Sequence, residues 1–205
     1  MRRTIATTGA ADMPSRSSRL IDAPQAAPTA ERWILSAHAS PEVARTEWYL
    51  HGVAMLPLGA QFSAVRVPGH LVRVLAASSD PLDADAVLVQ ALDGGPVICD
   101  LRGPRYYALV PSGVPRTWRQ AAEDWRQHEV ECLGHGTYLG VPRLDAVAVP
   151  LRGNGCYWSV PLVPTGKLCK PLSVARLIAA GVHALEEDRT LWSAGGSNPP
   201  PSPTA

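Results

Sequence analysis

Asp100 is the acidic residue best placed for chemistry, because it ends a short apolar run over residues 96–99 and precedes a turn. A carboxylate at a strand end can act in catalysis or bind a metal, and it can equally accept backbone N–H groups within a tight hairpin. Leu101 and Arg102 follow it. No second acid therefore stands at the spacing of two-metal phosphoryl chemistry, which needs converging acids to hold its cations.

A second candidate site contains Cys132 and His135, which have the close spacing of two metal ligands. Cys156 and Cys169 could complete a site of three thiolates and one imidazole, although they do not form a close pair themselves. Such a site, together with Asp100, would suit a metal-assisted hydrolase. The alternative is that these cysteines are buried structural thiols.

Arg105 and Tyr107 begin the clearest strand pattern of the chain, over residues 105–110. Successive side chains of a strand point to opposite faces, so Arg105 and Tyr107 share one face and Tyr106 lies on the other. Arginine beside tyrosine on an open sheet can hold a phosphate or stack on a base. We therefore count Arg105, Tyr107 and His135 as ligand-binding candidates, with an ordinary solvated sheet face as the alternative.

Composition limits the classes of protein to consider. The formal net charge is +1, and residues 33–192 carry 14 basic against 15 acidic side chains. A duplex-binding domain usually has a clustered positive face, which this balance does not indicate. We find no signal peptide and no stretch of 18 apolar residues, so we expect a cytoplasmic protein without a membrane span and with reduced cysteines.

Hydrophobic periodicity and turn residues define the elements that must position these side chains. The sequence predicts five helices, over residues 40–50, 68–75, 80–92, 115–127 and 171–189. It predicts seven strands, over residues 53–58, 64–67, 96–99, 105–110, 129–133, 137–141 and 157–160. Trp118 and Trp125 share one side of the fourth helix, which favours a place in the core.

This order of elements indicates an α+β fold with a mixed or antiparallel central sheet and packed helices. We expect one domain over residues 32–192, between a disordered tail over residues 1–31 and a disordered, proline-rich tail over residues 193–205. The segment from Gly94 to Leu162 forms the β-rich centre of that domain.

Several patches resemble the bifunctional primase-polymerase (prim-pol) domain family. Residues 49–58 resemble its opening, in which a helix ends in glycine and a strand ends in Pro-Leu. Residues 103–110 resemble its glycine-containing turn and following strand, and residues 131–142 and 157–161 resemble its later strands. The same truncated pattern resembles the one in a group of short actinobacterial proteins.

The resemblance implies a shortened, non-catalytic relative. Prim-pol enzymes carry two acids with one residue between them, where this chain has only Asp100, and their histidine would fall near Arg105 or Tyr106. Our leading hypothesis is an accessory protein, without a cofactor, that binds DNA or a nucleotide through strands 96–110 and 132–141. A protein–protein interaction module, such as a homo-oligomer or regulatory subunit, is the alternative.

Overall fold

The structure is a computed structural model that describes residues 23–151, 155–163 and 166–195. Its helices are α1 (Ala23–Leu35), α2 (Pro41–His51), α3 (Gly69–Ala76), α4 (Pro81–Ala91), α5 (Val114–Thr117), α6 (Arg119–Trp125), the 3-10 turn η1 (Arg126–His128) and α7 (Pro171–Gly195). Its strands are β1 (Val53–Pro57), β2 (Phe62–Pro68), β3 (Val97–Asp100), β4 (Arg105–Pro111), β5 (Glu131–Leu133), β6 (Tyr138–Pro142) and β7 (Cys156–Val160).

The strands form two antiparallel sheets, which confirms the α+β class and the antiparallel form of the predicted sheet. The larger sheet has the order β5-β2-β4-β3-β7. Strands β2 and β3 run parallel with β4 between them, and β4 and β5 run parallel with β2 between them. Two interleaved split βαβ units of this kind make a ferredoxin-like arrangement, to which β7 adds an edge strand.

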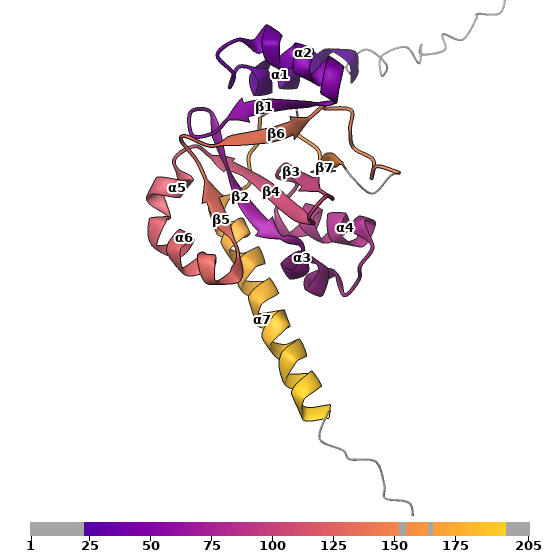
Figure 1. The fold of residues 1–205 in the computed structure, drawn as a ribbon, viewed down its shortest axis with the longest axis vertical. Helices are drawn as coiled ribbons and strands as arrows, with labels where there is room; N and C mark the ends of the chain where they lie inside the picture. The colour runs from indigo at the N-terminus through magenta and orange to yellow at the C-terminus, as the bar shows by residue number, and fades with distance from the viewer. Residues whose placement is uncertain (1–22, 152–154, 164–165, 196–205) are drawn as a thin grey trace, which may run out of the picture.

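Each face of the larger sheet contributes to its own hydrophobic core. On one face, Val65, Val67 and Tyr106 pack in a cluster with buried residues of α3, α4 and α7. On the other face, Ile98, Leu109 and residues of β2 pack in a cluster with α1, α2, β1 and β6. Figure 1 shows α1 and α2 lying over the two-stranded β1–β6 sheet at one end of the molecule.

Most predicted elements are present, and several of the helix-capping residues that predicted their ends lie at those ends in the structure. The Asp80 carboxylate accepts a hydrogen bond from the Leu82 N–H and so caps α4. Gly52 ends α2 in the left-handed conformation with φ of 72°, which costs a residue without a side chain little. Ser40 occupies the N-cap position of α2, but its side chain makes no capping hydrogen bond.

Four predictions differ from the structure. Residues 23–31, expected in the N-terminal tail, belong to α1, because Ala30, Ile34 and Leu35 are buried in the second core. The single helix expected over 115–127 is divided at Trp118 into α5 and α6, and its last turn is the 3-10 turn η1. The other tail residues, 1–22 and 196–205, lie outside the described residues.

The third difference concerns the strands on either side of His135. We expected one central sheet, but β5 joins β2 in the larger sheet whereas β6 pairs with β1 in the smaller one. The short segment between β5 and β6 thus links the two sheets. The Trp118 and Trp125 rings, 6.3 Å apart, pack against the first core as predicted.

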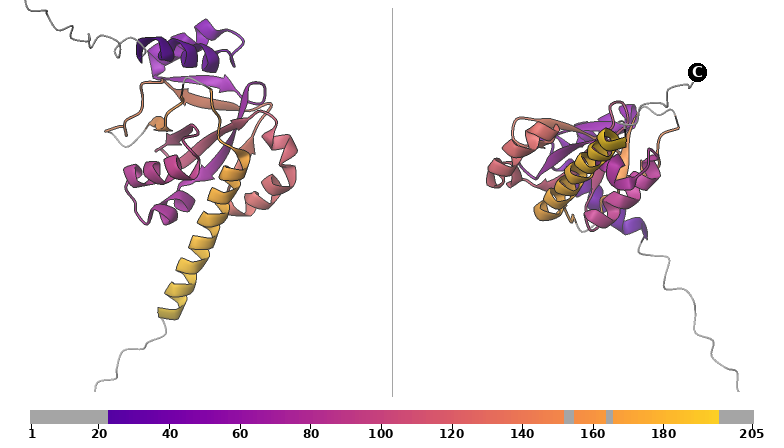
Figure 2. Two further views of the ribbon diagram at one scale, coloured as in Figure 1. Left: turned by 180° about the vertical axis from the view of Figure 1, so that it is seen from behind. Right: turned by 90° about the horizontal axis from the view of Figure 1, so that it is seen from below.

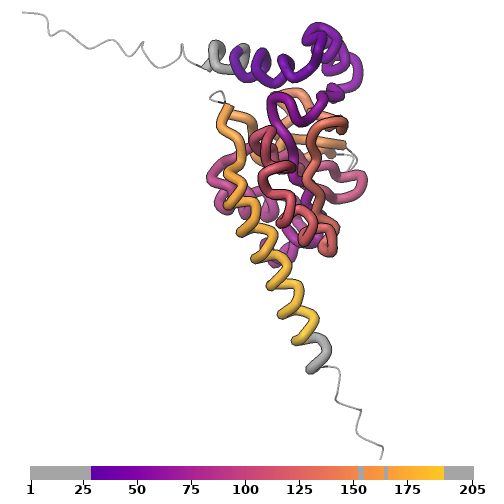
Figure 3. Tube along the Cα trace, turned by 90° about the vertical axis from the view of Figure 1, so that its left-hand side faces the viewer, coloured from indigo at the N-terminus to yellow at the C-terminus, as the bar shows by residue number. Residues whose placement is uncertain are grey.

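Helix α7 continues to Gly195, beyond the predicted end at residue 189, and its C-terminal part extends away from the body (Figures 1, 2 and 3). It packs most closely on α3 at Gly181, where an added Cβ would lie 2.9 Å from the Leu71 carbonyl oxygen. Within the described part of the chain, no helix is both long and apolar enough to cross a membrane.

A buried polar cluster ties α4 to β7. The Asp85 carboxylate accepts hydrogen bonds from the Tyr157 hydroxyl, at 3.1 Å, and from the Ser159 hydroxyl. Tyr157 is fully buried and Ser159 nearly so. Burial raises the pKa of Asp85 although both hydroxyls oppose that rise. The ionised carboxylate is therefore less favourable in the folded state than in the unfolded chain.

We predict that Asp85→Asn gains stability relative to the wild-type protein as the pH rises. The raised pKa means that stability from protonated Asp85 is present below the unfolded value of about 4 and is lost as the pH rises through the folded value. Urea unfolding between pH 4 and 7 measures the difference.

Asp85→Ala is the control, because it also removes the titrating carboxyl group but leaves the Tyr157 hydroxyl without its partner. It should be less stable than Asp85→Asn by about 1–3 kcal/mol at every pH. A stability difference between the wild-type protein and Asp85→Asn that stays constant with pH would contradict the prediction.

Candidate functional site

The second face of the larger sheet changes from apolar to polar along its two central strands. On β2, Phe62 and Ala64 are buried in the second core, whereas Arg66 follows on the same face. On β4, Leu109 is buried, Tyr107 is half-buried and Arg105 is exposed. The β1–β6 sheet and its helices thus leave part of this face uncovered.

A cleft of about 530 Å³ lies where the polar part of the face meets α2 and the smaller sheet. That volume falls within the range of small-molecule sites. The larger sheet contributes a carboxylate, a guanidinium, a phenol and a thiol, and the opposite wall contributes an acid, an imidazole and apolar groups. The lining residues are Glu47, His51, Val53, Met55, Asp100, Arg102, Tyr107, Leu139, Gly140 and Cys156.

Asp100 occupies the end of β3 and makes the turn contact that its sequence position allowed. Its Oδ1 atom accepts hydrogen bonds from the Arg102 backbone N–H and from Arg102 Nε, both at 3.1 Å. Its Oδ2 atom accepts a third from Arg102 Nη2 at 3.3 Å. The carboxylate is thus in the cleft, but both of its oxygens are engaged by one arginine.

Arg105 and Tyr107 lie on one face of β4 and Tyr106 lies on the other, as predicted. Burial, and next the Asp100 carboxylate, raises the pKa of Tyr107, so the phenol stays protonated at neutral pH. Arg66, opposite Tyr107 on β2, forms an ion pair with Glu131 of β5. Arg105 is exposed at the outer end of this row.

Glu47 and His51 form the opposite wall, and we did not predict either of them as a site residue. They stand four residues apart on α2, so both point to one side of the helix. The Glu47 Oε2 atom accepts a hydrogen bond from the Met55 N–H at 2.8 Å, which fixes α2 to β1. That spacing of an acid and a histidine is the sequence signal that could have identified this wall.

His135 lies away from the cleft. Leu133 pairs with Ala64, and the His135 backbone contacts the turn at Gly59, so His135 is near the start of β2. Arg105 pairs with Pro68 at the end of β2, and a seven-residue strand is about 20 Å long. The structure thus brings Asp100 and Tyr107 together in the cleft, with Arg105 beside them, and leaves His135 out.

The cysteines do not converge on a metal site. Cys132 lies on β5 and Cys156 on β7, the two edge strands of the larger sheet, which stand about 19 Å apart at the usual strand spacing. Cys169 is buried, and all four cysteines are free thiols. Among the described residues, no group of three or more histidine, cysteine or acidic side chains could hold a metal ion. The predicted ligands Cys132 and Cys156 are therefore too far apart to bind one metal ion.

Comparisons of the chain with protein-family models, with curated proteins and with solved structures found no match. The cleft must therefore be interpreted from its own residues.

We predict that iodoacetamide alkylates Cys132 and Cys156 slowly at pH 8. Burial raises the pKa of each thiol to about 11, and only the thiolate reacts. The rate should be on the order of a hundredfold below that of a free cysteine with a pKa of about 8.5. Mass spectrometry of samples quenched over time measures the rate.

Protein unfolded in guanidinium chloride is the control and should react at the rate of free cysteine. Equally fast alkylation of the folded protein would contradict the burial argument for both thiols.

Proposed function

We propose that this chain is a non-catalytic, prim-pol-like accessory protein that binds a nucleotide or a short single strand of nucleic acid. The cleft beside β3 and β4 is the proposed site. The observation that carries the proposal is the half-buried Tyr107 ring, with Arg105 on the same face of the same strand and the cleft next to it.

These two residue types suit the two parts of a nucleotide. A tyrosine ring on a sheet can stack on any base, because every base has a π-face. An exposed arginine can donate two parallel hydrogen bonds to a phosphate. Val53 and Met55, with Gly140 between their side chains, add an apolar wall across the cleft, on which sugar or base atoms can pack.

The charge of the cleft favours a small ligand over a duplex. Arg102 is paired with Asp100 and Arg66 with Glu131, so two of the three arginines on this part of the sheet are already neutralised by carboxylates. Duplex binding draws on many uncompensated cations along a track. A ligand with one or a few phosphates needs far fewer of them.

The same pairing supports a binding role without catalysis. Asp100 is the acid on the turn where the resemblance would require two, and Arg102 engages both of its oxygens. Glu47, the acid across the cleft, holds the Met55 N–H. Both carboxylates thus already accept hydrogen bonds from other groups of the protein.

The direct test measures binding of fluorescent single-stranded DNA, duplex DNA and nucleotides at low salt. We expect the single strand or the nucleotide to bind, and Tyr107→Ala to weaken that binding by about 5- to 150-fold, because stacking contributes about 1–3 kcal/mol per base. Arg105→Ala should weaken binding and reduce the dependence on salt by about one phosphate contact.

Tyr49→Ala and Arg119→Ala are matched controls, since both side chains are exposed and lie outside the cleft. Circular dichroism melts verify that each variant is folded. Binding to none of the three ligands, or equal binding by Tyr107→Ala and the wild-type protein, would overturn the proposal.

A protein-interaction module, such as a homo-oligomer, is the second candidate. Val43 and Leu50 stand two turns apart on one side of α2, and they are 50% and 71% exposed. Large apolar side chains on one exposed helix side are a feature of interfaces between proteins.

For this second candidate, we predict that sedimentation velocity detects a dimer at micromolar concentration and that Leu50→Asp restores the monomer. Leu191→Asp is the control, because Leu191 is similarly exposed but lies on α7. A monomer at every concentration tested would count against self-association through α2.

A further inference from the structure

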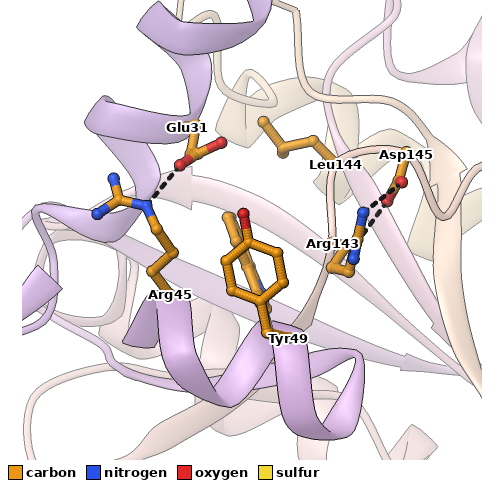
Figure 4. Close-up of a pocket in the computed structure, with 7 residues that line it drawn as sticks. Glu31, Arg45, Tyr49, Arg143, Leu144 and Asp145 are labelled. Carbon is orange, nitrogen blue, oxygen red and sulfur yellow. Dashed lines mark hydrogen bonds and ion pairs between the residues drawn. The ribbon is translucent and has the colours of Figure 1, made fainter. Parts of the chain in front are cut away.

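A second hollow, of about 340 Å³, lies between α1, α2 and the segment after β6 (Figure 4). Tyr49 of α2 and Leu144 of that segment stand on opposite sides of it, and the Trp48 indole contributes to its lining. Trp48 and Tyr49 face away from the side of α2 that carries Glu47 and His51, so the hollow is separate from the cleft.

The walls of this hollow are fixed before anything enters it. The Trp48 indole Nε1–H donates to the Val141 carbonyl oxygen at 2.8 Å. The Arg143 guanidinium stands over the Tyr49 ring, 5.9 Å from its centroid, and donates two hydrogen bonds to Asp145, at 3.0 and 2.8 Å. The Arg143 backbone N–H donates to the Gly52 carbonyl oxygen. A preformed site of this kind costs little conformational entropy on binding.

The charged residues that line the hollow are two acids and two arginines, and Arg45 also forms an ion pair with Glu42 outside the lining. Arg45 pairs with Glu31 at 2.9 Å on one side, and Arg143 pairs with Asp145 on the other (Figure 4). The lining therefore offers a charged occupant no unpaired group of opposite charge unless one of these pairs breaks. A neutral occupant does not need such a partner.

The space that remains is bordered by aromatic and aliphatic surface. Tyr49 keeps 74% of its surface exposed, with the Arg143 guanidinium over its ring. Leu144 packs against the second core and is only partly buried there. Tyrosine, tryptophan and arginine are the residue types that most often contribute the largest binding energies at interfaces. All three line this hollow.

We propose that this hollow binds one neutral aromatic ring of side-chain size, held between Tyr49 and Leu144. The ring can belong to a free aromatic amide or to a side chain presented by a peptide. This binding does not depend on the proposed nucleotide site.

The test titrates full-length ¹⁵N-labelled protein with N-acetyl-tryptophanamide and follows the Trp48 indole N–H resonance, which reports on the floor of the hollow. We expect saturable shifts with a Kd on the order of 1 mM, as suits a single ring. Tyr49→Ala should weaken binding about two- to tenfold, the usual effect of one aromatic pair. Leu144→Lys should abolish it.

Three further ligands test the charge that the hollow accepts and the source of the ring. Tryptamine and indole-3-acetate, which carry opposite charges on the same ring, should both bind more weakly than the neutral amide. A capped five-residue peptide of alanines around one tryptophan should bind at least tenfold more tightly than the amide if a peptide supplies the ring, and with equal affinity if the ring alone is recognised.

Leu50→Ala is the control variant, because Leu50 is on the other side of α2, and it should bind the amide as the wild-type protein does. Absence of a saturable shift, equal binding of a charged analogue, or unchanged binding by Leu144→Lys would overturn the proposal. Tyr107→Ala should leave this binding intact, so failure here and failure of the nucleotide proposal are distinguishable.

Discussion

The seven-residue pairing of β2 with β4 is the constraint on which the rest of the structure depends. Val65 and Val67 of β2 face one side of the sheet, and Phe62 and Ala64 face the other. A sheet that is apolar on both faces must be covered on both. Helices α3, α4 and α7 cover the first face, and the second requires a separate layer built from α1, α2 and the β1–β6 sheet.

The candidate cleft lies where that second layer ends. Within one strand, the residues of the second face pass from buried Leu109 through Tyr107 to exposed Arg105. The change in polarity along β4 therefore coincides with the edge of the covering layer. A ligand entering there meets apolar groups from the small sheet and polar groups from the large one, which is the combination that a molecule with a ring and a charged group requires.

Much of this architecture could be predicted from local sequence patterns. Three of these patterns depend only on neighbours within a few residues: the apolar alternation of residues 105–110, Asp80 before α4 with Pro81 at its first position, and the glycine after α2. The sequence likewise placed Arg105 and Tyr107 on one face, because strand alternation is a local property.

The features that the sequence did not predict depend on contacts between distant segments. Helix α1 is stabilised by burial of Ile34 and Leu35 against the second core, which its alanine- and proline-rich composition does not indicate. Strands β5 and β6 look alike as patterns, yet they pair with β2 and β1 in different sheets. Glu47 and His51 became site residues only because α2 lies across from Asp100.

The contact at Gly181 has a mechanical consequence for α7. There the helix lies closer to α3 than a residue with a Cβ would normally allow, since an added Cβ would be only 2.9 Å from the Leu71 carbonyl oxygen. The 14 residues that follow Gly181, up to Gly195, span about 21 Å of helix. A pivot of a few degrees at this point would be magnified into a displacement of an ångström or more at the far end. The direction in which the far end of α7 points thus depends on the absence of a side chain at residue 181.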